Sequence, residues 1–159
     1  MDWQKFSSVD FVPPLENCAK SKFDVHGFVY VWCFVLKDKD SPKNEKEVPF
    51  YVGQTYRLWG RIDDYYWASF QAPTDFKVGK AIQYLAEQKF KVRLKHSLSE
   101  DRLKDEAELI ESIGKKKLLN GILDHECTAG DEKFIRGKIK EKIEALIREA
   151  ESSQTPLSD

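Results

Sequence analysis

The sequence of 159 residues contains no long hydrophobic run, no repeat and no excess of charge of one sign. A membrane-spanning helix needs about twenty consecutive apolar residues, so we expect none, and the first residues lead us to expect no signal peptide. The net charge of −1 and the pI near 6.3 argue against a uniformly basic nucleic-acid-binding protein. Any basic surface that contacts nucleic acid must therefore be local.

Cysteine is scarce, and Cys18, Cys33 and Cys127 are far apart in the chain. Their odd number and spacing match neither a disulfide framework nor a metal-binding pattern, so we expect free thiols in a reducing compartment, the cytoplasm. The run Asp124-His125-Glu126-Cys127 is interpreted as a polar loop, because four adjacent residues cannot converge on one ion in regular structure.

Hydrophobic residues make up 41% of the chain, which is enough for one core. The most apolar stretch, residues 28–36, predicts a central strand buried on both faces. A charged loop over residues 37–47 leads to a second strand at 50–52, ending at a glycine. This order favours an antiparallel hairpin. Tyr30 and Tyr51 could then lie near each other, although the register cannot be obtained from sequence.

Residues 90–94 alternate apolar and basic side chains, which predicts a third strand with one basic face. Helical periodicity marks the stretches 56–65, 74–86, 99–113 and 131–151. The candidate N-caps are Thr55, Thr74 and a capping box of Ser97 and Glu100. Residues 1–23 show no period, and Trp3, Phe6 and Phe11 are expected to hold this arm against the domain.

The helix at 99–113 carries an anomaly, because Glu106 lies on the same stripe as Leu103, Ile110 and Ile113. A carboxylate on a core-facing stripe is costly unless it is paired or bound to a metal. The alternative is a glutamate at the edge of the stripe whose carboxylate reaches solvent.

The last helix, 131–151, combines a narrow apolar seam with charges that nearly cancel. The seam consists of Phe134 or Ile135, then Ile139, Ile143, Leu146 and Ile147. We therefore expect a helix that docks on the rest of the chain or pairs with its copy in a homodimer, and not a basic arm.

These positions together resemble the GIY-YIG nuclease family. Phe28-Val29-Tyr30 stands where the family has Gly-Ile-Tyr, and Tyr51-Val52-Gly53 stands for Tyr-Ile-Gly. Four later positions also match the family: Arg61, Tyr65, Glu106 and Asn120. The chain departs from the family pattern at Phe28, where the family has glycine, and at Gln54, where several relatives carry lysine.

The resemblance implies an α+β fold, with a small three-stranded sheet flanked by helices and followed by the long C-terminal helix. The expected division is an arm at 1–23, a nuclease domain at 24–123 and a helical extension at 124–159. It also implies a metal-dependent DNA endonuclease in which Glu106 binds Mg²⁺ or Mn²⁺ and Arg61 binds the phosphate. Tyr30 or Tyr51 would act on the attacking water.

In the same interpretation Tyr65 takes a position often held by His or Tyr, and Asn120 braces the site. Residues 50–98 contain eight bases against four acids, so the near-neutral chain has a basic middle. The candidate DNA contacts are Arg57, Lys77, Lys80, Lys91, Arg93 and Lys95. Lys77 and Lys80 could instead belong to a solvated helix face.

Two other functions remain open from the sequence. One is a catalytically inactive member of the same fold that only binds nucleic acid. The other is a protein-interaction module that acts through the helix at 131–151. Metal-dependent nicking of a plasmid distinguishes the nuclease from both.

Overall fold

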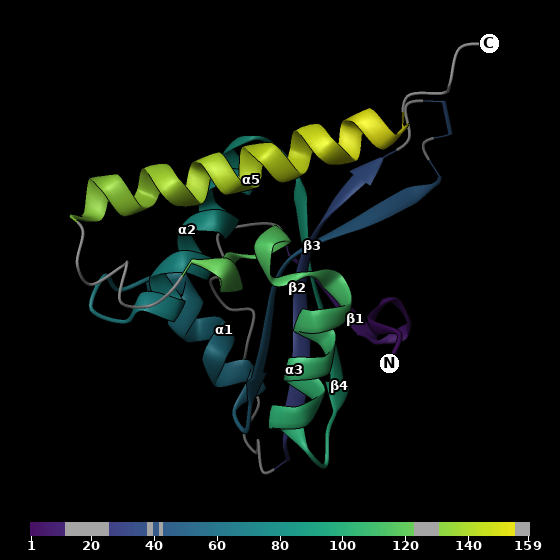
Figure 1. The fold of residues 1–159 in the computed structure, drawn as a ribbon, viewed down its shortest axis with the longest axis vertical. Coiled ribbons are helices and arrows are strands. Elements are labelled where there is room, and N and C mark those ends of the chain that lie inside the picture. The colour runs from purple at the N-terminus through teal and green to yellow at the C-terminus, as the bar shows by residue number, and fades with distance from the viewer. Residues whose placement is uncertain (12–25, 38–39, 42, 123–130, 155–159) are drawn as a thin grey trace.

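A four-stranded antiparallel sheet lies at the centre of the protein, in the strand order β1-β4-β2-β3. The computed structural model describes residues 1–11, 26–37, 40–41, 43–122 and 131–154. Figure 1 shows the sheet running between a group of helices on one side and α3 on the other. The strands are β1 (Ser7–Phe11), β2 (Phe28–Lys37), β3 (Glu45–Thr55) and β4 (Lys91–Leu98).

The predicted hairpin is confirmed, since β2 and β3 pair along their whole length. Tyr30 lies opposite Gly53 and Trp32 opposite Tyr51, with a register shift just after Trp32. Tyr30 and Tyr51 therefore project from the same face of the sheet, and their ring centroids are 6.4 Å apart. β3 also continues beyond the glycine, so the strand does not end there as predicted.

The prediction of three strands is wrong, because β1 forms a fourth. Residues 7–11 pair with β4 from Ser7 opposite His96 to Phe11 opposite Val92. Three polar residues in this short edge strand obscure its alternation, so only the pairing partner reveals it. The predicted docking of the arm is confirmed for Phe11, which is buried. It is also confirmed for Trp3 and Phe6, which are partly buried against a smaller core cluster of Val29, Val31, Val52, Leu109 and Leu118.

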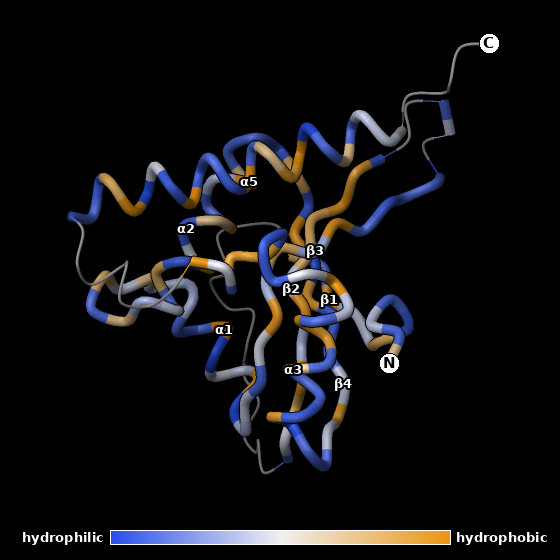
Figure 2. The backbone as a smooth tube through the Cα atoms, in the orientation of Figure 1, coloured by the Kyte–Doolittle hydropathy of each residue, from blue (hydrophilic) through white to orange (hydrophobic). Residues whose placement is uncertain are grey.

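Three helices cover one face of the sheet and build the larger core: α1 (Leu58–Trp67), α2 (Pro73–Glu87) and α5 (Glu132–Gln154). Trp32 and Phe34 of β2 are at the centre of this core, with no exposed surface. Apolar and polar stretches alternate along α5 in Figure 2, as expected for a helix buried on one side.

The seam of α5 packs on its own chain. Ile135, Ile139 and Ile143 are fully buried in the larger core, whereas Phe134 is 57% exposed, which decides between the two predicted starts of the seam. The docking alternative therefore accounts for the seam, and a homodimer would have to use another surface of this helix.

The opposite face of the sheet is covered by α3 (Arg102–Ile113), whose Leu109 packs on Val29, Val31 and Val52. Leu103 was predicted to lie on the inward stripe, and this is wrong, since it is 61% exposed. The inward stripe runs instead through Arg102, Glu106 and Leu109, so it begins one residue before Leu103. Short 3₁₀ turns at Trp3–Lys5, Lys115–Lys117 and Leu119–Gly121 complete the described elements.

All three predicted helix caps are wrong by two to four residues. Thr55 is the last residue of β3, and its hydroxyl accepts the backbone N–H of Arg57, which is itself the N-cap of α1. Ala72 precedes α2 in place of Thr74, because a proline occupies the first helical position. Asp101 caps α3, accepting the N–H of Lys104, in place of the predicted capping box.

Of the predicted free thiols, Cys33 is buried in the sheet and unpaired, and burial raises the pKa of its thiol. Cys18, Cys127 and the rest of the run at 124–127 lie outside the described residues. Among the helices that the structure describes, none combines the length and the hydropathy that a membrane span requires.

Candidate active site

Tyr30 reaches across the sheet to the free edge of β3. Its ring lies over Gly53, and a Cβ at that position would come within 2.8 Å of Tyr30 Cε2 and closer still to the hydroxyl. Only glycine leaves room for this crossing. The hydroxyl of Tyr30 is thereby carried to the place where α1 approaches the sheet.

The hydroxyls of Tyr30 and Tyr65 share a hydrogen bond in the core. Tyr65 lies on α1 with its ring edge-on to Trp32, at a centroid distance of 5.8 Å. Arg61 lies one turn earlier on α1, and its Nη2 donates to the Tyr65 hydroxyl at 3.4 Å. The predicted residues Tyr30, Arg61 and Tyr65 therefore form one connected chain of polar groups.

The Arg61 guanidinium also contacts two carboxylates. Its Nη1 is 3.0 Å from Asp64 Oδ2, and its Nη2 is 2.8 Å from Asp75 Oδ1. Burial raises the pKa of Asp75, although the charge of Arg61 lowers it. These contacts hold the guanidinium in one orientation, but a phosphate would have to compete with two anions for it.

Sequence reasoning missed both carboxylates. The i, i+3 spacing from Arg61 to Asp64 was an available signal, because such pairs share a helix face. No local signal pointed to Asp75, which comes from the start of α2 and meets Arg61 only through the packing of α1 against α2.

Glu106 approaches the same edge of β3 from α3, on the other face of the sheet. Within the described residues its carboxylate has no hydrogen-bond or ion-pair partner, and burial raises its pKa, although Arg102 lowers it. Its charge also contributes to raising the pKa of Tyr30, which places the carboxylate and the phenol in one electrostatic environment. A half-buried acid without a partner fits a bound cation.

A metal at this position would have few protein ligands. Among the described residues, no three His, Cys, Asp or Glu side chains gather into a ligand cluster. Glu106 would therefore be the one carboxylate ligand from this part of the chain, with water and substrate oxygens completing the shell. That composition suits Mg²⁺, which keeps several of its waters and is often held by one or two carboxylates.

Asn120 fixes the exposed edge of β3 beside the site. Its Nδ2 donates to the Val52 carbonyl at 2.8 Å, and its Oδ1 accepts the Val52 N–H at 3.0 Å. The side-chain amide thus satisfies both backbone groups of one residue on an edge strand, as a neighbouring strand would. This geometry supports the bracing role expected of Asn120.

The tyrosines hold their protons firmly. Burial raises the pKa of Tyr30, against the opposing effects of the hydrogen bond to Tyr65 and the charge of Arg61. Burial also raises the pKa of Tyr65 well above its ordinary value. Both groups are therefore neutral hydrogen-bonding groups at physiological pH, and Arg61 alone does not convert either into a base.

The candidate DNA contacts divide into two groups. Arg57, the N-cap of α1, is exposed beside the site, and Lys80 is partly exposed on α2. Lys77, by contrast, is 4% exposed and its Nζ donates to the Ile122 carbonyl at 2.7 Å. Lys77 therefore lies in the core rather than on the solvated face that the sequence left open.

The predicted basic face of β4 is neutralised within the protein. Arg93 pairs with Glu45 at 3.0 Å and Glu47 at 3.1 Å, and also with Asp10. Lys95 is buried and pairs with Glu47 at 3.0 Å. Lys91 lies 3.6 Å from Asp10 and 3.9 Å from Glu45. These three bases form ion pairs within the sheet. Arg57 and Lys80 are therefore the better placed candidates for contacting DNA.

The six residues proposed for chemistry come from four elements and one 3₁₀ turn, and the structure gathers them around the Gly53 end of β3. Comparison of the chain with protein-family models, with curated proteins and with solved structures finds no match, so a functional conclusion rests on this geometry.

Proposed function

We propose that the protein is a metal-dependent DNA endonuclease of the GIY-YIG type. The observation that carries the proposal is that two sets of groups lie at one edge of the sheet: the hydrogen-bonded Tyr30, Tyr65 and Arg61, and the Glu106 carboxylate, which has no partner among the described residues. A fixed cation, neutral hydroxyls and a free carboxylate are the groups that phosphodiester hydrolysis uses.

Hydrolysis forms a bond from a water oxygen to phosphorus and breaks the bond from phosphorus to a sugar oxygen, which leaves as a hydroxyl. Arg61 would bind the non-bridging phosphate oxygens, because a guanidinium forms two parallel hydrogen bonds with them. Its orientation is set beforehand by Asp64 and Asp75, so little is lost in ordering it.

Tyr30 and Tyr65 would orient the attacking water as neutral hydrogen-bonding groups. Their hydroxyls share one hydrogen bond, and the Tyr65 hydroxyl also accepts one from Arg61, so the Tyr30 hydroxyl keeps the greater capacity for a further partner. Tyr51 lies beside Tyr30 and is 8% exposed, closer to solvent than the other two.

Glu106 would hold the metal, and a bound Mg²⁺ would supply the positive charge that neutralises the phosphate and the departing oxygen. The carboxylate comes from the opposite face of the sheet to Arg61. The phosphate would therefore lie between the two charges, at the edge of β3.

The test is nicking of supercoiled plasmid across a Mg²⁺ titration, with EDTA as the metal-free control. We expect nicked circles with Mg²⁺ or Mn²⁺ and none with EDTA. Glu106→Gln should lose activity by about a thousandfold or more, because several kcal/mol of charge stabilisation depend on the metal. Its DNA binding should persist. Glu108→Gln, an exposed glutamate on the same helix, is the matched control and should nick normally.

A second candidate is a fold that binds DNA without cutting it. The pairing of Arg61 with two carboxylates favours this reading, since those anions occupy the groups that a phosphate needs. A gel shift without nicking, at any concentration of Mg²⁺ or Mn²⁺, would decide for it and against the endonuclease.

A further inference from the structure

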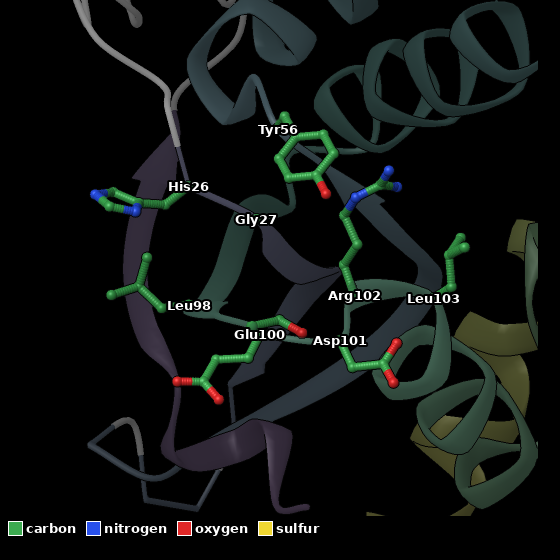
Figure 3. Close-up of a pocket in the computed structure, with 9 residues that line it drawn as sticks. His26, Gly27, Tyr56, Leu98, Glu100, Asp101, Arg102 and Leu103 are labelled. Carbon is green, nitrogen blue, oxygen red and sulfur yellow. The ribbon is translucent and has the colours of Figure 1, made fainter.

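A pocket of about 600 Å³ lies at the N-terminal end of α3, beside the candidate active site. Figure 3 shows Tyr56 on one side of it and Glu100 and Asp101 on the other, with Arg102 between. Tyr56 follows β3 directly, and Arg102 lies one turn before Glu106 on α3. The pocket therefore continues the same edge of the sheet, but none of the proposed catalytic residues lines it.

Tyr56 and Arg102 form a flat, braced surface in this pocket. The Arg102 guanidinium carbon is 4.0 Å from the centroid of the Tyr56 ring, and Arg102 also donates to Gln54 on β3. The Nε of Arg102 is buried and has no hydrogen-bond partner among the described residues. Tyr56 is nevertheless 55% exposed, so its ring remains available for a further planar group.

Apolar side chains gather around the same surface. Of the six large hydrophobic residues that are exposed in the described chain, Tyr56, Leu98 and Leu103 line this one pocket. Such concentration of exposed apolar surface marks a binding site, because single exposed residues would otherwise be scattered. The ligand must therefore present a flat and largely uncharged face.

The pocket has two carboxylates, of Glu100 and Asp101, against the one guanidinium of Arg102, and this balance disfavours a phosphate. Glu100 and Asp101 lie opposite Tyr56, and the Glu100 carboxylate has no partner among the described residues. A carboxylate repels an anion but accepts hydrogen bonds from amino groups, including those of nucleobases. A planar base with an exocyclic amino group satisfies both the aromatic side and the acidic side of the pocket.

The distance along α3 between Arg102 and Glu106 suits a nucleotide close to the cleaved phosphate. Arg102 and Glu106 are four residues apart on α3, about 6 Å along the helix axis. Stacked nucleotides are about 3.4 Å apart along one strand. Arg102, which lines the pocket, is therefore separated from Glu106 along the helix axis by about the length of one to two stacked nucleotides.

We propose that this pocket takes an unstacked nucleobase bearing an exocyclic amino group, from a nucleotide within two positions of the cleaved bond. The base stacks on Tyr56 and directs its amino edge to Glu100. The site gives the enzyme a preference for adenine, cytosine or guanine over thymine at that position. This inference rests on the proposed endonuclease function.

The first test maps the nicks that the full chain makes in a plasmid of known sequence. We expect thymine to be depleted at one position within two nucleotides of the cut, relative to the plasmid composition. Tyr56→Ala should remove the bias and Tyr56→Phe should keep it, because phenylalanine still stacks. Glu100→Gln should admit thymine, because its amide can donate to the thymine carbonyl.

The second test does not depend on cleavage. Glu106→Gln protein without metal is titrated into a duplex oligonucleotide carrying 2-aminopurine, whose fluorescence falls when it stacks on an aromatic ring. With Tyr56→Ala added, the dissociation constant obtained from the quenching should rise about tenfold, as expected for the loss of one stacking contact. Phe134→Ala is the matched control, since Phe134 is an exposed aromatic on α5 that also lies near a cation, Lys138, and it should change nothing.

The outcomes separate the two proposals. Nicking with equal base frequencies around the cut, together with wild-type behaviour of Tyr56→Ala in both assays, overturns the base pocket and leaves the endonuclease intact. Absence of nicking by the unmodified protein overturns the endonuclease and the base preference beside the cut. Base binding at Tyr56 is then decided by the 2-aminopurine titration, and wild-type behaviour of Tyr56→Ala in that titration overturns the pocket.

Discussion

The phenol ring of Tyr30 lies across Gly53 on the neighbouring strand, in the space that any larger residue would fill. This contact carries the Tyr30 hydroxyl to Tyr65 and links two strands to α1. The absence of a side chain at Gly53 is therefore a requirement of the site as well as of the sheet.

Gly53→Ala should displace the Tyr30 hydroxyl. The new methyl would come within 2.8 Å of the ring, which requires a shift that costs about 1–3 kcal/mol of stability. Nicking should fall further than stability explains. Gly137→Ala on α5 is the control, since nothing lies within 4 Å of its added methyl and helix propensity should stabilise it by up to about 1 kcal/mol. Equal behaviour of the two variants in melting and nicking assays would contradict the prediction.

Arg61→Ala and Arg57→Ala should differ in kind. Arg61 is held by Asp64, Asp75 and Tyr65, so its loss should reduce the cleavage rate about a hundredfold or more at saturating DNA. Arg57 is exposed, and its loss should weaken binding and reduce the salt dependence of binding by about one unit. Single-turnover rates and binding isotherms at several salt concentrations separate the effects. Equal losses of rate would show that the wrong arginine has been assigned.

The pH dependence of stability should reveal the cost of the Glu106 charge. Because burial raises the pKa of Glu106 above its ordinary 4.5, the folded state binds this proton more tightly than the unfolded state. The resulting stabilisation is present below pH 4.5 and is lost as the pH rises through the folded pKa.

Glu106→Gln should therefore melt at a higher temperature than the wild type at neutral pH, and the difference should vanish on acidification below that range. Mg²⁺ at neutral pH should raise the melting temperature of the wild type but not of the variant, because only the carboxylate binds it. Glu108→Gln should melt like the wild type at neutral pH, and Mg²⁺ should raise its melting temperature as it does for the wild type, because Glu106 is intact. A variant that melts like the wild type at every pH would place Glu106 in solvent.

Arg93→Met should act on folding and leave the salt dependence of DNA binding unchanged. Arg93 pairs with Asp10, Glu45 and Glu47, so its removal leaves three carboxylates close together. We expect a loss of about 1–3 kcal/mol in denaturant unfolding, towards the lower end because Asp10 is well solvated. Lys80→Met should leave the free energy of unfolding nearly unchanged and should reduce the salt dependence of DNA binding. If DNA binding by the Arg93→Met variant depended less on salt than that of the wild type, β4 would have to be counted as part of the DNA-binding surface.

The sequence by itself determined the features that depend on local pattern. The apolar run from residue 28 fixed a central strand, and the loop after it fixed an antiparallel partner. The isolated carboxylate of Glu106 was visible because helical spacing placed it among apolar neighbours. Such patterns indicate which side of each segment faces the core and which faces solvent. In α3 the structure keeps one buried side, although Leu109 lies on it and Leu103 does not.

Only the tertiary structure decided which groups meet. The basic residues Lys91, Arg93 and Lys95 read as a free surface until the register placed Asp10 and Glu47 against them from other strands. Likewise Tyr30 joins Tyr65 because the strand register puts Gly53 beneath its ring. Register and helix packing bring together residues that are distant in the chain, and their energies depend on partners that no local window contains.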